Sequence, residues 1–183
     1  QGAIRRDATR PAPHNAYTSV YELYDAMTAK NEDWLSRDIS YGVWSFDEKP
    51  PEGAVSASSL TVDFSASVNQ VIWRYDETAG GWIRAQGGKD AITADGKTIS
   101  ASNVAVVITD ISILDAVGRR KIRTIGEGEG YVLRDGMKID ATWKKPSTKE
   151  RLRFYDQAGK EIPMKPGATW IEVVGGEGQV TIK

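Results

Sequence analysis

The sequence predicts a mainly β domain of the α+β type, with a curved antiparallel sheet or barrel-like sandwich and one N-terminal helix. Two observations lead to this prediction. Apolar residues recur at helical spacing only near the N-terminus, whereas from about Ser58 onward they alternate with a period of two. Turn signals then separate short apolar runs at intervals of about 8–12 residues, which is typical of all-β domains.

The composition is that of an ordinary folded domain and excludes several classes of protein. The 183 residues are 40% apolar and 27% charged, and the net charge of −1 indicates neither disorder nor a nucleic-acid partner. One histidine and no cysteine provide no zinc tetrad or disulfide, so no metal or cofactor is predicted. No run approaches the ~20 apolar residues of a membrane span. Gln1–Arg6 resembles the interior of a protein, so we expect a fragment of a longer chain.

Three segments are predicted along the chain: an extended arm over 1–16, a helix and loop over 17–57 that pack on the sheet, and a β domain over 58–183. Pro11 and Pro13 favour the extended arm, because each fixes its own φ and disfavours helix in the residue before it.

The helix is predicted to run from about Val20 to Lys30. Ser19 followed by Glu22 is a capping-box pattern at its start. The apolar residues of this segment fall at helical spacing, at Val20, Leu23, Tyr24 and Met27.

Two later segments define the predicted sheet best. Val104–Ile113 is apolar on both faces, which indicates a central strand buried on both sides. Met137–Trp143 alternates apolar and polar residues, which indicates a strand with one solvent-facing side. Further strands are predicted at 60–64, 71–75, 82–84, 152–155, 170–174 and 180–182.

Five predicted turns each place an aspartate before a glycine. Aspartate hydrogen-bonds its own backbone and glycine accepts a positive φ, so hairpin turns are predicted. A calcium loop needs a higher density of oxygen ligands than any of them offers. The turns are Asp76–Gly80, Asp95–Gly96, Asp115–Gly118, Asp135–Gly136 and Asp156–Gly159.

A glycine-rich stretch at 126–130 looks superficially like a phosphate-binding loop. Residues 126–130 read Gly-Glu-Gly-Glu-Gly without the Lys-Ser/Thr or the following helix of a phosphate loop, so a glycine-rich bulge or strand connection is predicted.

Most of the six tryptophans are expected in core or cross-strand packing. Trp73 and Trp82, which flank one predicted hairpin, are the best candidates for an exposed pair able to stack on sugar rings.

The arm carries the polar cluster that turn chemistry does not explain. Arg6, Arg10, His14 and Asn15 are the candidate ligand-binding residues, and we expect them to converge in space. Arginines can hold a carboxylate or phosphate, and histidine can act as acid or base. The alternative is a structural clamp, in which the same groups only anchor the arm. No catalytic residue is assigned. Whether the domain is an enzyme is left open, with a non-enzymatic role preferred.

An ordered set of motifs resembles the C-terminal half of the YerB-like predicted lipoproteins of bacteria. The resemblance spans nearly the whole chain, although no single motif in it is diagnostic. Its pieces are R-x-x-x-R-x-A-P-H-N at 6–15, W-R-Y-D at 73–76, the apolar strand at 104–111, Gly118-Arg119, I-x-x-I-G-x-G at 122–128, D-G-x-x-I-x-x-T-W-x-K at 135–145, R-x-Y-D-x-x-G-K-x-I at 153–162 and P-G-x-T-W-I at 166–171.

The resemblance implies an extracytoplasmic protein, anchored by a lipid upstream of this fragment and paired with an N-terminal domain of its own. It implies no known function. The first hypothesis is therefore a non-enzymatic envelope module that binds a polymer, a peptide or a partner protein. The second is half of a hydrolase or transferase acting on envelope material, with its site at the junction to the missing domain. The third is a structural support for that domain.

Overall fold

The computed structural model describes residues 3–12, 14–30 and 42–183. Contacts divide the chain into two compact units, Gln1–Ser40 and Tyr41–Lys183, and each is described by itself. No helix among the described residues is long and apolar enough to cross a membrane.

The first unit contains a short β-hairpin and the helix. Strand β1 (Arg5–Arg6) pairs antiparallel with β2 (Ala16–Tyr17), so the arm folds back on itself rather than running extended throughout. Helix α1 (Val20–Ala29) begins where the capping pattern predicted it, because the Ser19 side chain accepts a hydrogen bond from the Glu22 amide at 3.2 Å. The predicted packing of this helix on the sheet stays a prediction.

The second unit is mainly β, as predicted. Among its described residues neither sheet closes into a barrel. Its elements are β3 (Val55–Ser56), β4 (Ser59–Val62), the 3₁₀ turn η1 (Ser67–Asn69), β5 (Val71–Asp76), β6 (Gly81–Gln86), β7 (Lys89–Asp90), β8 (Ser100–Ala101), β9 (Asn103–Ile108), β10 (Ile111–Ile113), β11 (Arg120–Ile122), β12 (Gly126–Arg134), β13 (Met137–Lys145), β14 (Arg153–Tyr155), β15 (Thr169–Val174), the 3₁₀ turn η2 (Glu177–Gln179) and β16 (Val180–Ile182).

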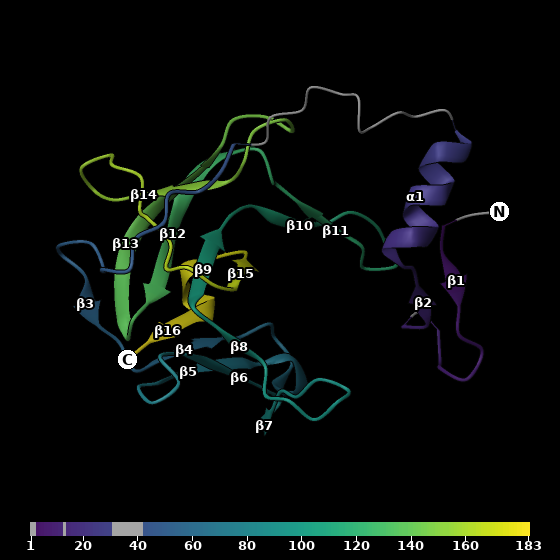
Figure 1. Ribbon diagram of the computed structural model, residues 1–183, viewed down its shortest axis with the longest axis horizontal. Helices are drawn as coiled ribbons and strands as arrows, with labels where there is room; N and C mark the ends of the chain where they lie inside the picture. Colours follow the sequence, from purple (N-terminus) through teal and green to yellow (C-terminus); the bar gives the residue numbers. More distant parts are fainter. Residues whose placement is uncertain (1–2, 13, 31–41) are drawn as a thin grey trace. The chain divides into compact units, whose positions relative to one another are not determined.

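The strands form two six-stranded sheets and one separate ribbon (Figure 1). The first sheet has the order β14-β13-β12-β9-β15, with β3 beside β13, and the second has the order β16-β4-β5-β6-β7, with β8 beside β6. Among the strands that the structure describes, β10 and β11 pair only with each other. One pairing departs from the antiparallel prediction, because β15 joins β9 in parallel.

Two cores share the first sheet. One lies between the sheets and includes Leu60, Trp73, Val104 and Leu133, and the other covers the opposite face of the first sheet. Strand β9 supplies Val104 and Val106 to one core and Ala105 and Val107 to the other. The predicted burial on both sides is therefore confirmed for Val104–Val107. It is wrong for the end of the predicted strand, because residues 111–113 lie outside the sheet in the separate strand β10, where Ile113 is 67% exposed.

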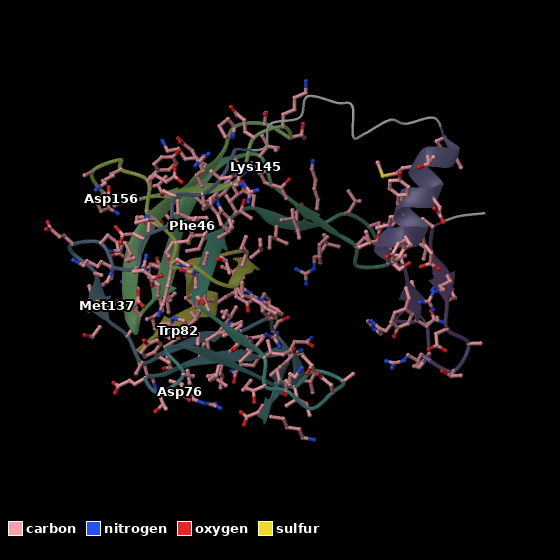
Figure 2. The ribbon with its side chains drawn as sticks, in the orientation of Figure 1. Phe46, Asp76, Trp82, Met137, Lys145 and Asp156 are labelled. Carbon is pink, nitrogen blue, oxygen red and sulfur yellow. The ribbon has the colours of Figure 1, made fainter. Side chains whose placement is uncertain are left out.

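The prediction that Trp73 and Trp82 form an exposed pair is wrong. Both side chains have 0% exposure and lie in the core between the sheets. Figure 2 labels Trp82 there. Their positions on β5 and β6 place both residues on the face of the second sheet that the first sheet covers. The spacing of residues along one hairpin does not reveal which face of a sheet is covered. Trp143 is also buried, whereas Trp170 retains 36% exposure. Trp34 lies outside the described residues.

Aspartates and glycines shape the turns as predicted. The Asp76 carboxylate accepts hydrogen bonds from the amides of Thr78 and Ala79. Asp135 and Gly136, between β12 and β13, take φ values of +53° and +69°.

The glycine-rich stretch at 126–130 opens strand β12. A Cβ added at Gly130 would come within 2.1 Å of the Val106 carbonyl oxygen, so the close approach of β12 to β9 requires glycine there.

Candidate functional site

The arm brings two of the four candidate binding residues into direct contact. Arg6 Nη1 donates to Asn15 Oδ1 at 2.7 Å, and Asn15 Nδ2 donates to the Asp7 carbonyl at 3.1 Å. Asn15 is the buried member, with 8% exposure. These bonds join the two sides of the β1–β2 hairpin where its strands meet the loop.

The other two candidate residues, Arg10 and His14, take no part in these hydrogen bonds. Arg10 makes an ion pair with Asp7 at 3.6 Å and places its guanidinium 5.7 Å from the Tyr17 ring centre. A side-chain and a backbone hydrogen bond from Thr9 lower the pKa of Asp7. His14 is exposed and makes no hydrogen bond or ion pair with the described part of the chain. The structure therefore joins Arg6, Arg10 and Asn15 around Asp7 and leaves His14 apart.

A second polar cluster lies at the β12–β13 turn. The Arg134 side chain has 0% exposure and makes an ion pair with Asp135 at 2.7 Å. Its two terminal nitrogens donate to the carbonyls of Pro163 at 2.9 Å and Asp47 at 2.8 Å. Lys165 also contacts Asp135 at 2.8 Å. Burial raises the pKa of Asp135, but hydrogen bonds from Lys165 and Arg134 outweigh it and lower that pKa overall. Each of the three guanidinium nitrogens has a hydrogen-bond partner within the fold, so we interpret this cluster as structural.

The outer edge of β15 is the clearest surface for recognition. β15 is the last strand of the first sheet, and β9 is its one strand neighbour among the described residues. Asn103 N donates to the Ala168 carbonyl, and Thr109 N donates to the Val174 carbonyl. Because bonding residues alternate along a parallel ladder, Thr169, Ile171 and Val173 turn their amides and carbonyls away from β9. We call this row of unpaired backbone groups the β15 edge.

Aromatic and charged side chains lie beside the β15 edge. Trp170 packs 5.4 Å from the buried Trp73, centre to centre, and Arg84 lies 4.9 Å from the Trp170 ring centre. Glu172 has 5% exposure and accepts a hydrogen bond from Trp73 Nε1 at 2.9 Å. Burial raises the pKa of Glu172, and the bond from Trp73 and the charge of Arg84 offset only part of that rise. The Nε atom of Arg84 is buried without a hydrogen-bond partner in the described structure.

A cavity of about 610 Å³ lies at the C-terminal end of β15. Its wall includes Val173 and Val174 from β15, Ile111 and Ile122 from the β10–β11 ribbon, and Phe64. An apolar hollow in line with an open strand edge offers both parts of β-strand recognition: backbone hydrogen bonds along the edge and a pocket for side chains.

The sequence alone does not identify the β15 edge as a site. It predicted a strand over 170–174, but an edge position depends on which strands pair, and no local signal specifies that pairing. The described residues contain no group of three or more His, Cys, Asp or Glu side chains able to hold a metal ion.

Comparison with known proteins identifies relatives. Residues 60–171 match the family described as "Protein of unknown function (DUF3048) C-terminal domain". The chain is 30% identical over 175 residues to the "Putative lipoprotein YerB" of Bacillus subtilis (strain 168), an alignment that covers 93% of this chain and 50% of that protein. A crystal structure of Bacillus subtilis YerB superposes with a TM-score of 0.80 at 26% identity, covering 99% of this chain and 59% of that one. This chain thus spans about half the length of the curated relative that it matches.

Proposed function

This chain belongs to the DUF3048 family as its C-terminal domain, and we propose that it is a non-enzymatic interaction module of a bacterial lipoprotein. The module acts outside the cytoplasmic membrane and binds an extended peptide along the β15 edge. The location rests on the similarity to YerB, whose description is "Putative lipoprotein". Whole-protein activity and the partnership with a second, N-terminal domain are part of the proposal, because the similarity covers half of YerB.

The open edge of β15 is the observation that carries this proposal. An unpaired strand edge displays a row of backbone donors and acceptors, and proteins normally block such edges with charges, proline or a covering segment. The exposed side chains on β15 are instead Trp170 and Ile171, each with 36% exposure. A peptide added here would gain backbone hydrogen bonds from Thr169, Ile171 and Val173 and could place one side chain in the cavity at the end of the strand.

A cleft that held His14 together with Arg6 and Arg10 would favour the enzyme alternative. Arg6 contacts Asn15, Arg10 contacts Asp7, and His14 is exposed. No observation on the described residues favours that alternative over an interaction module. A ligand-binding role for the arm stays a prediction.

The test selects peptides from a phage-displayed library of linear peptides on the whole chain and compares two substitutions of Ile171. Ile171→Pro removes an outward amide but no ladder bond to β9, because proline is tolerated at a strand edge whose amide faces solvent. Ile171→Ala keeps the amide and is the matched control. We expect Ile171→Pro to weaken binding of the selected peptides by about tenfold or more, and Ile171→Ala to weaken it less.

Hydrogen exchange provides an independent measurement on the unsubstituted chain. Adding a selected peptide should protect the amides of Thr169, Ile171 and Val173, while the already bonded amides of β9 stay as slow as before. Failure to select any peptide, or protection confined to other residues, would contradict the proposal. Protection at the β15 edge would support it even if Ile171→Pro proved poorly folded.

A further inference from the structure

The β10–β11 ribbon projects from the two sheets and pairs with neither (Figure 1). Its strands align Ile111 with Ile122 and Ile113 with Arg120, and residues 114–119 form the turn between them. A two-stranded ribbon has little stability of its own, so its persistence as an exposed feature needs a reason outside the core.

The end of this ribbon is strongly apolar. Ile113 is 67% exposed, Leu114 is 61% exposed and Val117 is 85% exposed. A single exposed aliphatic residue needs no explanation, but three within five residues at the end of a projection indicate an interaction site. We call Ile113, Leu114 and Val117 the apolar tip.

The charges of the ribbon favour an anionic partner. Both of its acidic residues are paired, since Asp115 caps the turn and contacts Arg119 while Asp110 contacts Arg123 at 2.7 Å. Arg120 and Lys121 are exposed and make no ion pair within the described ranges. The ribbon therefore presents aliphatic side chains at its end and two unpaired positive charges directly behind them.

We propose that the β10–β11 ribbon docks on an anionic lipid bilayer. The apolar tip enters the boundary between headgroups and acyl chains, and Arg120 and Lys121 contact lipid phosphates. This is the arrangement of interfacial membrane anchors, in which buried apolar area and attraction to anionic lipid act together. The proposal goes beyond peptide binding at the β15 edge and would hold if that binding failed.

Size and charge favour a lipid surface over a protein partner. A stable protein interface buries roughly 800 Å² on each side, and a projecting tip of three aliphatic residues offers far less. A bilayer accepts a small wedge, because it can close around the tip and supply phosphates at the depth of Arg120 and Lys121. Such docking would fix the domain against the membrane surface.

The experiment measures cosedimentation of the whole chain with vesicles of phosphatidylcholine, with and without phosphatidylglycerol. We expect binding to the phosphatidylglycerol vesicles that weakens as salt is raised. The double substitution of Leu114→Ser and Val117→Ser should reduce binding by tenfold or more, because it removes most of the apolar tip. Arg120→Gln with Lys121→Gln should reduce binding by about fivefold for each charge removed.

Matched controls separate the ribbon from general surface effects. Val68→Ser with Ile92→Ser removes two aliphatic side chains that are 70% and 62% exposed elsewhere on the same unit. Lys89→Gln with Lys149→Gln removes two exposed positive charges. Both controls should leave vesicle binding unchanged. Arg120 also borders the cavity at the end of β15, so peptide binding is measured on every variant, and the apolar-tip variant should retain it.

The outcomes are distinct. Absence of vesicle binding by the unsubstituted chain would overturn the proposal, as would binding that ribbon variants and controls reduce equally. A ribbon variant that lowers the unfolding free energy without altering vesicle binding would show that the tip packs on protein, and would also overturn it. Loss confined to the ribbon variants, with unchanged unfolding, would support it.

Discussion

At the residue scale, Asp135 combines a conformational role with an electrostatic one. Its φ of +53° is required by the tight β12–β13 turn, and its carboxylate lies 2.7 Å from the buried Arg134 and 2.8 Å from Lys165. Asparagine adopts positive φ as readily as aspartate, so Asp135→Asn changes the charge while preserving the turn. The two roles can therefore be measured separately.

We expect Asp135→Asn to lower the free energy of unfolding by on the order of 3 kcal/mol, because it leaves the buried Arg134 charge without its carboxylate. The pKa of Asp135 is lowered in the fold, so its stabilisation is present above the ordinary carboxyl pKa of 3.8 and is lost as pH falls below it. The variant should therefore show a flatter acid limb in urea unfolding measured against pH. Asp140→Asn, at a surface pair with Lys138, should cost less than about 1 kcal/mol; equal losses would contradict this account.

At the element scale, helix α1 begins at the predicted residue, Val20, but none of its described residues is buried. Its capping by Ser19 is local, whereas an amphipathic helix gains most of its stability by packing its apolar face. The predicted packing of segment 17–57 on the sheet would supply that stability, and Leu23 belongs to the apolar face.

If the helix packs as predicted, Leu23→Ser should lower the unfolding free energy of the chain by about 1–2 kcal/mol through lost apolar burial. Val68→Ser is the control, since Val68 is 70% exposed on a separate 3₁₀ turn and should change stability by less than about 0.5 kcal/mol. Chemical denaturation followed by circular dichroism measures both. Indistinguishable effects would indicate that the helix face is not covered within this chain.

At the scale of the β unit, two cores depend on one sheet. Leu133 on β12 fills the core between the sheets, while Val132 and Ile139 fill the core on the other face of the same sheet. Because β9 and β12 contribute to both, neither core can be lost while the other stays intact. We therefore expect one cooperative unfolding transition.

Leu133→Ala and Ile139→Ala each create a cavity in one core, and each should lower the unfolding free energy by about 2–5 kcal/mol. Tryptophan fluorescence and far-ultraviolet circular dichroism should report the same midpoint for each variant, with an unchanged denaturant slope. Separate midpoints for the two probes in either variant would show that the cores unfold independently.

Sequence by itself determined the features that depend on near neighbours in the chain. Ser19 caps a helix through an amide three residues away, and Asp76 caps a turn through amides two and three residues away. In β9 and β13 the spacing of apolar residues predicts which side chains are buried, because alternate side chains of a strand point to opposite faces. Mainly β architecture, the helix start and the turns followed from such local rules.

Tertiary structure alone decided which strands meet, and with that the candidate sites. Trp73 and Trp82 are buried because the first sheet covers their face of the second, and β15 is an edge because no described strand pairs with its other side. Arg6 meets Asn15 because the arm folds back as a hairpin, a pairing that Pro11 and Pro13 did not reveal. The physical reason is that pairing of distant strands is selected by the summed burial and hydrogen bonding of the whole domain, whereas propensity and periodicity act over a few residues.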